Sequence, residues 1–206
     1  MSLVLTETEY DGEDFVEVDL ADAQLGAIEF RDCDFSGAVL SGCVTSGTTF
    51  TRCRFVGAEM YSSTHSGSSF LGCTFERTSW ADAKLTDCRL LGTTFTHCRL
   101  TGVRMVDCDL TLTSFAGEKL AGADLSGLRM REANLTGADL SGCDLRRADL
   151  AGARAGRANL TGADLRGAIV DAGTWVGANL SGAVVDVDQA VLYAVAHGLT
   201  LGPAQD

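Results

Sequence analysis

Proline and long apolar stretches are what this sequence most clearly lacks. Its 206 residues include a single proline, Pro203, beside 24 glycines. No run approaches the roughly 18 apolar residues that a membrane span needs, and residues 1–15 lack the basic segment that begins a signal peptide. We therefore expect a cytoplasmic protein with no membrane partner. A glycine-rich chain that is 46% hydrophobic and almost free of proline predicts a regular backbone, not disorder.

Basic residues are also scarce. The chain has 16 lysines and arginines against 28 aspartates and glutamates, a formal net charge of −12. This sign disfavours direct binding to nucleic acid or to an anionic membrane surface. It fits a basic partner better, or a protein that itself binds DNA. The acidity is uneven, because residues 1–35 hold eleven acidic side chains and only one basic residue, Arg31.

A five-residue repeat organises the chain. From Phe15 to Val185 every fifth residue forms a series of 35 positions, here called centres, of which only Thr45 and His65 are polar. All nine phenylalanines are centres, and 18 of the 24 glycines lie two residues after a centre. A period of five fits neither an α-helix nor a simple strand. It predicts a coil whose successive faces point the centre, and the small residue two before it, inward.

The spacing of identical centres predicts how many faces form one coil. Stacked coils place like residues on like, so a recurrence every 20 residues indicates four faces of five residues. Coils should then lie about 4.8 Å apart, the spacing of a β-ladder. One such column contains Phe15, Phe35, Phe55, Phe75, Phe95 and Phe115, and a second contains Phe30, Phe50 and Phe70.

The repeat unit resembles that of a known family. Residues 133–137 read Ala-Asn-Leu-Thr-Gly and residues 163–167 read Ala-Asp-Leu-Arg-Gly, which is similar to the A(D/N)LXX pattern of pentapeptide-repeat proteins. The resemblance spans about residues 10–185, with the five-residue phase unbroken from 15 to 185. It implies an all-β fold, a right-handed quadrilateral β-helix, over residues 1–186.

Cysteine and histidine are the residues that invite a chemical reading. All eight cysteines lie two residues before a centre, where neighbouring repeats carry alanine, and no C-x₂-C spacing suggests a metal site. We expect small buried side chains in a reducing compartment. They are Cys33, Cys43, Cys53, Cys73, Cys88, Cys98, Cys108 and Cys143.

Two polar residues fall at inward positions. His65 is a centre and Thr45 lies one coil away on the same face, so we expect a hydrogen bond between them. Glu118 takes the small-residue position two before a centre, and we expect a local bulge that turns it out to water. These structural readings outweigh catalytic ones, and we expect no enzyme, metal or cofactor.

The five-residue pattern stops after Val185, and residues 187–206 form a separate C-terminal module. Residues 187–197 predict a short helix with Asp186 or Asp188 as N-cap and Gly198 just past the end. A helix that is apolar nearly all round must be covered on more than one side. It is either a simple cap on the last coil or, as we prefer, a cap that also pairs with a second copy. The expected dimer interface comprises Val187, Val191, Leu192, Val195 and Leu199.

The C-terminal residues carry a narrower resemblance. Residues 185–191 (VDVDQAV) and 196–199 (AHGL) are similar to the C-terminus of the MfpA-like group of mycobacterial fluoroquinolone-resistance proteins, which is related to the Qnr proteins. The resemblance implies a homodimer that imitates duplex DNA, binds and inhibits DNA gyrase, and confers fluoroquinolone resistance. The alternative is a pentapeptide-repeat scaffold, or an antibiotic self-immunity protein, that binds another partner.

Acidic side chains near the proposed dimer junction are the candidate contacts for gyrase. Asp124, Asp144 and Asp164 are 20 residues apart and should form a three-coil ladder, while Asp139 and Asp149 lie in the same half. An ordinary solvated face explains them equally well, because aspartate before a centre belongs to the repeat. Nearby arginines also dilute a continuous acidic stripe.

Overall fold

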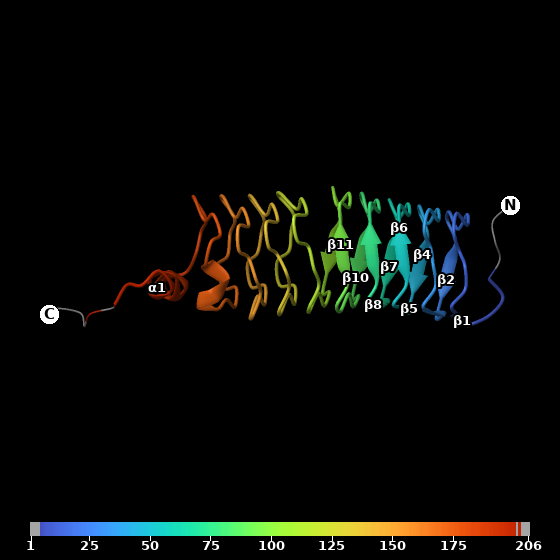
Figure 1. The fold of residues 1–206 in the computed structure, drawn as a ribbon, viewed down its shortest axis with the longest axis horizontal. Coiled ribbons are helices and arrows are strands. Elements are labelled where there is room, and N and C mark those ends of the chain that lie inside the picture. The colour runs from blue at the N-terminus through green and yellow to red at the C-terminus, as the bar shows by residue number, and fades with distance from the viewer. Residues whose placement is uncertain (1–4, 201, 203–206) are drawn as a thin grey trace.

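The protein is an elongated four-sided β-solenoid with its two termini at opposite ends (Figure 1). The computed structural model describes residues 5–200 and 202. Neighbouring coils pair in parallel, each residue opposite the one 20 positions later, as in Phe30 with Phe50 and Phe50 with Phe70. The prediction of four five-residue faces per coil is confirmed.

Three faces of the solenoid carry parallel sheets of three-residue strands, and the fourth is held by isolated bridges such as Val39 with Glu59. The first sheet has the order β1-β3-β5-β8, the second β12-β10-β7-β4-β2 and the third β11-β9-β6. The strands are β1 (Glu9–Asp11), β2 (Gln24–Gly26), β3 (Glu29–Arg31), β4 (Val44–Ser46), β5 (Thr49–Thr51), β6 (Arg54–Val56), β7 (Thr64–Ser66), β8 (Ser69–Leu71), β9 (Thr74–Glu76), β10 (Lys84–Thr86), β11 (Thr94–Thr96) and β12 (Arg104–Val106).

The corners of the coil explain where the glycines lie. From Gly12 to Gly182, the residue two after each centre has a positive φ, with the single exception of Ala172. Glycine adopts this left-handed conformation without the steric cost that other residues meet. Arg52 and Leu112 adopt it too, at φ of 52° and 61°. The corner geometry is therefore set by the coil, and glycine is the residue that suits it best.

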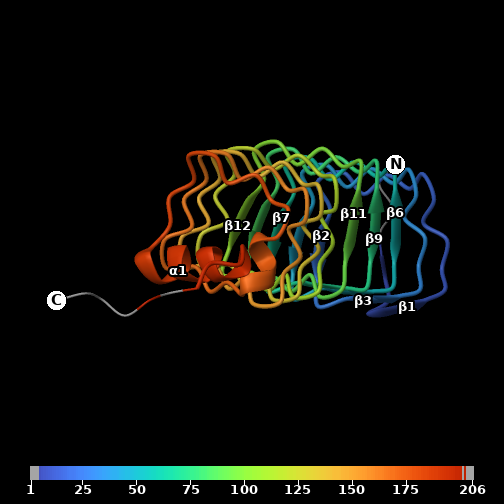
Figure 2. The same ribbon diagram turned by 60° about the vertical axis from the view of Figure 1, so that its left-hand side comes forward.

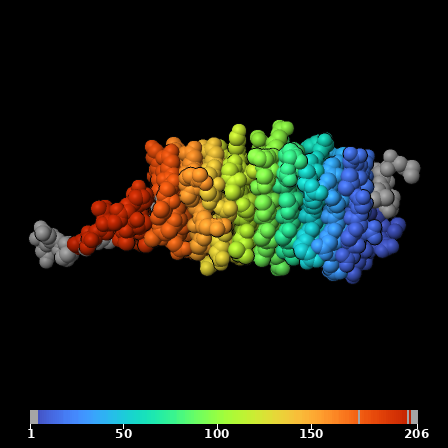
Figure 3. All heavy atoms as spheres, viewed as in Figure 1, coloured from blue at the N-terminus to red at the C-terminus, as the bar shows by residue number. Residues whose placement is uncertain are grey.

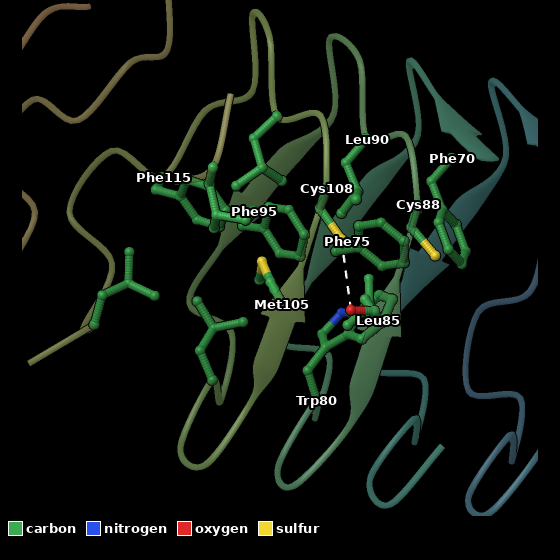
Figure 4. Packing of buried hydrophobic residues seen from close by; sticks show 14 of the residues in the cluster. Phe70, Phe75, Trp80, Leu85, Cys88, Leu90, Phe95, Met105, Cys108 and Phe115 are labelled. Atoms are coloured by element: carbon green, nitrogen blue, oxygen red, sulfur yellow. Dashed lines mark hydrogen bonds between the residues drawn. The ribbon is translucent and has the colours of Figure 1, made fainter. Parts of the chain in front are cut away.

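Stacked aromatic rings fill the first half of the core. Phe15 lies over Phe35 with ring centroids 4.8 Å apart, and the column continues through Phe75 to Phe95 at 5.1 Å. Rings on adjacent faces of a coil meet edge to face, as do Phe70 and Phe75 at 5.8 Å (Figure 4). Both predicted phenylalanine columns are confirmed, because every pair 20 residues apart is stacked.

The cysteines serve as small core residues, as predicted. Seven of the eight are buried and Cys98 is partly buried, and all are free thiols. The Cys108 thiol donates to the carbonyl of Leu85 at 3.6 Å, the bond drawn in Figure 4. Burial raises the pKa of the Cys43 thiol to about 12. Thiols in this environment stay protonated and are poor nucleophiles.

The predicted hydrogen bond between Thr45 and His65 is present. Thr45 Oγ1 lies 2.8 Å from His65 Nδ1, and Ser63 Oγ lies 2.9 Å from His65 Nε2. Ser68 extends this buried network with a 2.8 Å hydroxyl contact to Thr45. Desolvation lowers the pKa of His65 to about 3, so the ring is neutral at physiological pH. Both ring nitrogens are occupied by core partners.

The expectation of an unbroken five-residue phase is wrong near the C-terminal end. A short 3₁₀ helix, η1 (Ala172–Trp175), replaces one face of the last coils. The carboxylate of Asp171 accepts the N–H of Gly152, which takes the place of a ladder bond. The N–H of Arg157 then reaches Gly177, 20 residues on, where Arg147 reaches Arg166, 19 residues on. The insertion shifts the backbone pairing by one residue before the repeat resumes.

The expectation that Glu118 turns outward is also wrong. Its side chain is buried, and its carboxylate accepts the backbone N–H groups of His97 at 2.5 Å and Cys98 at 3.0 Å. Two backbone donors offset the cost of burying the charge, because a carboxylate that accepts such bonds is stabilised in its ionised form.

Candidate partner-binding surfaces

The C-terminal helix α1 (Val187–Ala196) is anchored to the last coils through its first turn. Asp186 is the N-cap and forms a capping box with Gln189, whose Oε1 accepts the N–H of Asp186 at 2.8 Å. The buried Gln189 side chain also donates to the carbonyls of Leu165 and Ala168, both at 2.8 Å. These carbonyls lie on the open edge of the solenoid, so Gln189 stands in for part of a further coil. The sequence analysis missed this role, although the Asp-x-x-Gln spacing marks a capping box.

Beyond that anchor the helix presents apolar side chains to solvent. All five predicted interface residues are exposed, from Leu192 at 37% to Val187 at 80%. Gly198 follows the helix with φ of 82°, as expected of the residue past a helix end. Contiguous exposed apolar surface of this kind marks an interaction site in soluble proteins.

The helix leaves part of the solenoid end uncovered. In Figure 2, α1 lies to one side of the last coils instead of across them. A cavity of about 530 Å³ opens between the helix and the last coil, lined by Leu180, Ala183, Val185 and Ala190 among others. The core residues Leu180 and Val185 are accordingly only partly buried. The end of the rod therefore combines an open core with an apolar helix, and Figure 3 shows the helix projecting beyond the coils.

The acidic ladder forms in the predicted register. Asp124 bridges Asp144 and Asp144 bridges Asp164 across successive coils. Each carboxylate also accepts the backbone N–H two residues later, that of Ser126, Arg146 or Arg166. These bonds hold the three carboxylates in the same orientation on one face.

Arginines neutralise two of the three ladder carboxylates. Arg146 pairs with Asp144, and Arg166 pairs with Asp164 at 2.6 Å. Arg146 also lies 3.9 Å from Asp164 and so spans two coils. Hydrogen bonding to Arg166 lowers the pKa of Asp164 to about 2. The face is consequently less negative than its three aspartates alone suggest.

The other two predicted acidic residues lie on different faces. Asp139 pairs in register with Lys119 and Asn159, and Asp149 with Arg129 and Ile169. Asp149 forms an ion pair with Arg131 at 3.1 Å. The five predicted aspartates are thus spread over three sides of the rod, and only Asp124, Asp144 and Asp164 share one.

Neither a membrane span nor a metal centre is found in residues 5–200. No helix there has the length and apolarity to cross a bilayer. No group of three or more histidine, cysteine, aspartate or glutamate side chains in the same described part is arranged to hold a metal ion.

Comparison with known protein families defines the class of this chain. The model of the pentapeptide repeat region matches residues 78–155, and the model of pentapeptide repeats in eight copies matches residues 28–64 and 143–182. Together with the coil geometry, these matches identify the chain as a pentapeptide-repeat protein. A search of curated proteins found no match.

Solved structures show the same fold over nearly the whole chain. A trypsin-treated variant of QnrB1, a plasmid-mediated fluoroquinolone resistance protein, is similar with a TM-score of 0.79 and 23% identity, covering 94% of this chain and 97% of that one. Full-length QnrB1 is similar with a TM-score of 0.75 and 23% identity, covering 93% and 100%. At this identity the likeness establishes the fold, and no comparison singles out the MfpA-like group.

Proposed function

We propose that this protein binds and inhibits DNA gyrase, a type II topoisomerase, as a mimic of duplex DNA, and that it confers fluoroquinolone resistance. The observation that carries the proposal is the match to QnrB1 over more than nine tenths of both chains. The acidic composition supports it, since a rod with a net charge of −12 suits the basic surface of a DNA-binding enzyme. Gyrase and its inhibitor would meet in the cytoplasm.

The proposed active form is a homodimer joined at the C-terminal ends. The exposed Val191 and Leu192 of α1, with the open cavity beside Val185, provide an apolar surface at the end of the rod. Two rods joined there would roughly double the length of the mimic. A two-fold axis through the helices would bring both acidic ladders toward the centre, because Asp164 lies in the coil nearest the helix.

Gyrase supercoiling in the presence of the purified protein tests the proposal. Micromolar protein should inhibit supercoiling, and expression should raise the fluoroquinolone concentration that cells tolerate. Replacing Val191 by Glu should give folded monomers in sedimentation and reduce inhibition, whereas Val106→Glu, an exposed valine in mid-rod, should leave the dimer intact. Full supercoiling at micromolar protein would end the gyrase proposal.

One observation favours a second candidate, a scaffold or antibiotic self-immunity protein that binds a different partner. The ion pairs of Arg146 and Arg166 reduce the negative potential of the ladder, and a DNA mimic gains nothing from them. An affinity capture experiment on cell extract distinguishes the two, since recovery of gyrase supports mimicry and recovery of another protein without a topoisomerase supports the scaffold.

A further inference from the structure

A slit interrupts the solenoid on two adjacent faces, between residues 98–107 and residues 118–126. Elsewhere the N–H of each centre donates to the next coil, as in Phe95 to Ser114 at 2.9 Å and Leu110 to Arg129 at 2.7 Å. Across the slit, within the described part of the chain, neither Leu100 nor Met105 has such a bond.

The two coils also stand apart in space. A groove of about 410 Å³ separates them, lined by residues 100–104 on one side and 119–124 on the other. In Figure 1 the interval lies just beyond β12, where the ribbon turns from green to yellow. The slit therefore exposes two backbone edges in the middle of the rod.

Glu118 holds the slit open. It occupies the inward position that Cys98 fills one coil earlier and Ala138 one coil later. Its carboxylate takes the N–H of His97, which in a regular coil would pair with the carbonyl of Ala116. Closing the slit would also place Arg99 directly opposite Lys119, since residues 20 apart pair, and like charges so placed repel.

Unpaired cations surround the slit. Lys84, Arg99, Arg104 and Lys119 are all exposed, and among the described residues none of them has an ion pair or a side-chain hydrogen bond. Lys84 and Lys119 are the only two lysines of the chain, and Lys84 pairs in register with Arg104. A local cationic surface on a strongly acidic protein is a specific feature of this position.

We propose that the slit binds an extended acidic peptide segment of a partner protein. Glu118 shows the mode of binding, because its carboxylate enters the slit and accepts two backbone N–H groups. The N–H groups of Leu100 and Met105 along the same edge would accept carboxylates of the segment in the same way, with the four cations around them providing charge complementarity. An extended chain matches these donors because they follow one another along a β-edge. This site is separate from the proposed gyrase surface and does not depend on it.

Fluorescence anisotropy with a labelled peptide of alternating glutamate and serine tests the charge requirement, using the full-length protein at low salt. The peptide should bind, and the matching glutamine–serine peptide should not. Lys119→Glu should weaken binding about tenfold or more. Arg154→Glu makes the same charge change at an exposed arginine away from the slit and should leave the affinity within about twofold. Equal binding of the two peptides, no binding at millimolar protein, or equal losses in the two variants would overturn the proposal.

Glu118→Ala tests the slit itself, because it keeps all four cations while removing the wedge. Hydrogen exchange of the Leu100 and Met105 amides should be fast in the wild type and slow in this variant as the ladder closes. Peptide binding should then be lost. Undiminished binding to a closed variant would show that the cations act as a simple surface patch and that the slit takes no part.

Discussion

The two halves of the rod build the same coil in different ways. All twelve strands lie before residue 107, in the half whose centres include the stacked phenylalanines. The later coils have mainly leucine centres and isolated bridges, yet their backbone bonds continue, as in Leu135 to Arg154 at 2.8 Å. The repeat therefore tolerates a wide range of core volume without losing its register.

The corners differ along with the core. In the second half the N–H of Ala138 donates to the carbonyl of Leu135 at 3.0 Å, which closes a tight turn. In the first half many corners lack this bond, and a hydroxyl or thiol instead reaches the preceding coil, as Thr48 does to Leu25 at 2.8 Å. Polar side chains thus link coils where aromatic rings fill the core, and backbone turns suffice where the core is small.

The largest expected effect separates the two kinds of core. Phe75→Ala removes a ring stacked on Phe55 at 4.7 Å and on Phe95 at 5.1 Å, and we expect it to lower the free energy of unfolding by about 4–5 kcal/mol. Leu145→Ala, at an equally buried centre of the second half, should cost about 3 kcal/mol. Urea denaturation measures both. Equal losses would show that ring stacking adds nothing to burial.

The polar network of the aromatic half should make stability depend on pH. The pKa of buried His65 is lowered to about 3, below the value of about 6.5 in an unfolded chain. Between these values the unfolded state binds a proton that the folded state does not, so stability falls as the pH falls from about 6.5 to 3. At pH 4 the loss attributable to His65 should be about 3 kcal/mol relative to pH 7.

His65→Leu is the control for that loss. Its denaturation midpoint should fall less steeply with pH than that of the wild type, while losses from carboxylates are common to both. Parallel pH profiles would contradict the assignment and show that His65 ionises in the folded protein as readily as in the unfolded chain.

The slit between the two halves provides a smaller effect of opposite sign. Glu118→Ala relieves the burial of a carboxylate and lets ladder bonds form at Leu100 and Met105. We expect a net gain of about 1 kcal/mol, because each backbone bond contributes about 0.5–1.5 kcal/mol and two bonds to the carboxylate are lost. Glu59→Ala, at an exposed position, should change stability by less than about 0.5 kcal/mol. Thermal denaturation compares them, and a destabilised Glu118→Ala would show that the carboxylate supports the coil.

The features that repeat were predictable, and those that occur once were not. Periodicity alone predicted the four faces, the phenylalanine columns and the Thr45–His65 bond, because stacking at 20 residues brings like positions together. The same reasoning failed at Glu118, whose burial depends on two backbone donors that become free only when the coil opens. It failed at η1 as well, since there a single side chain, that of Asp171, replaces a ladder bond and shifts the pairing by a residue. Of the candidate surface, the ladder register was predictable, but the partners that Arg146 and Arg166 choose were not.

The smallest expected effect concerns charge on the second half, where function is proposed. Arg146→Gln with Arg166→Gln would leave Asp144 and Asp164 unpaired and make the ladder more negative. If the ladder imitates DNA, this double variant should inhibit gyrase more strongly, by up to about fivefold, since exposed ion pairs are worth at most about 1 kcal/mol. Arg154→Gln with Arg157→Gln changes the net charge equally but lies off the ladder, and should leave the inhibitory concentration nearly unchanged. Supercoiling assays decide between them. Equal gains would mean that net charge, not the geometry of Asp124, Asp144 and Asp164, attracts the enzyme.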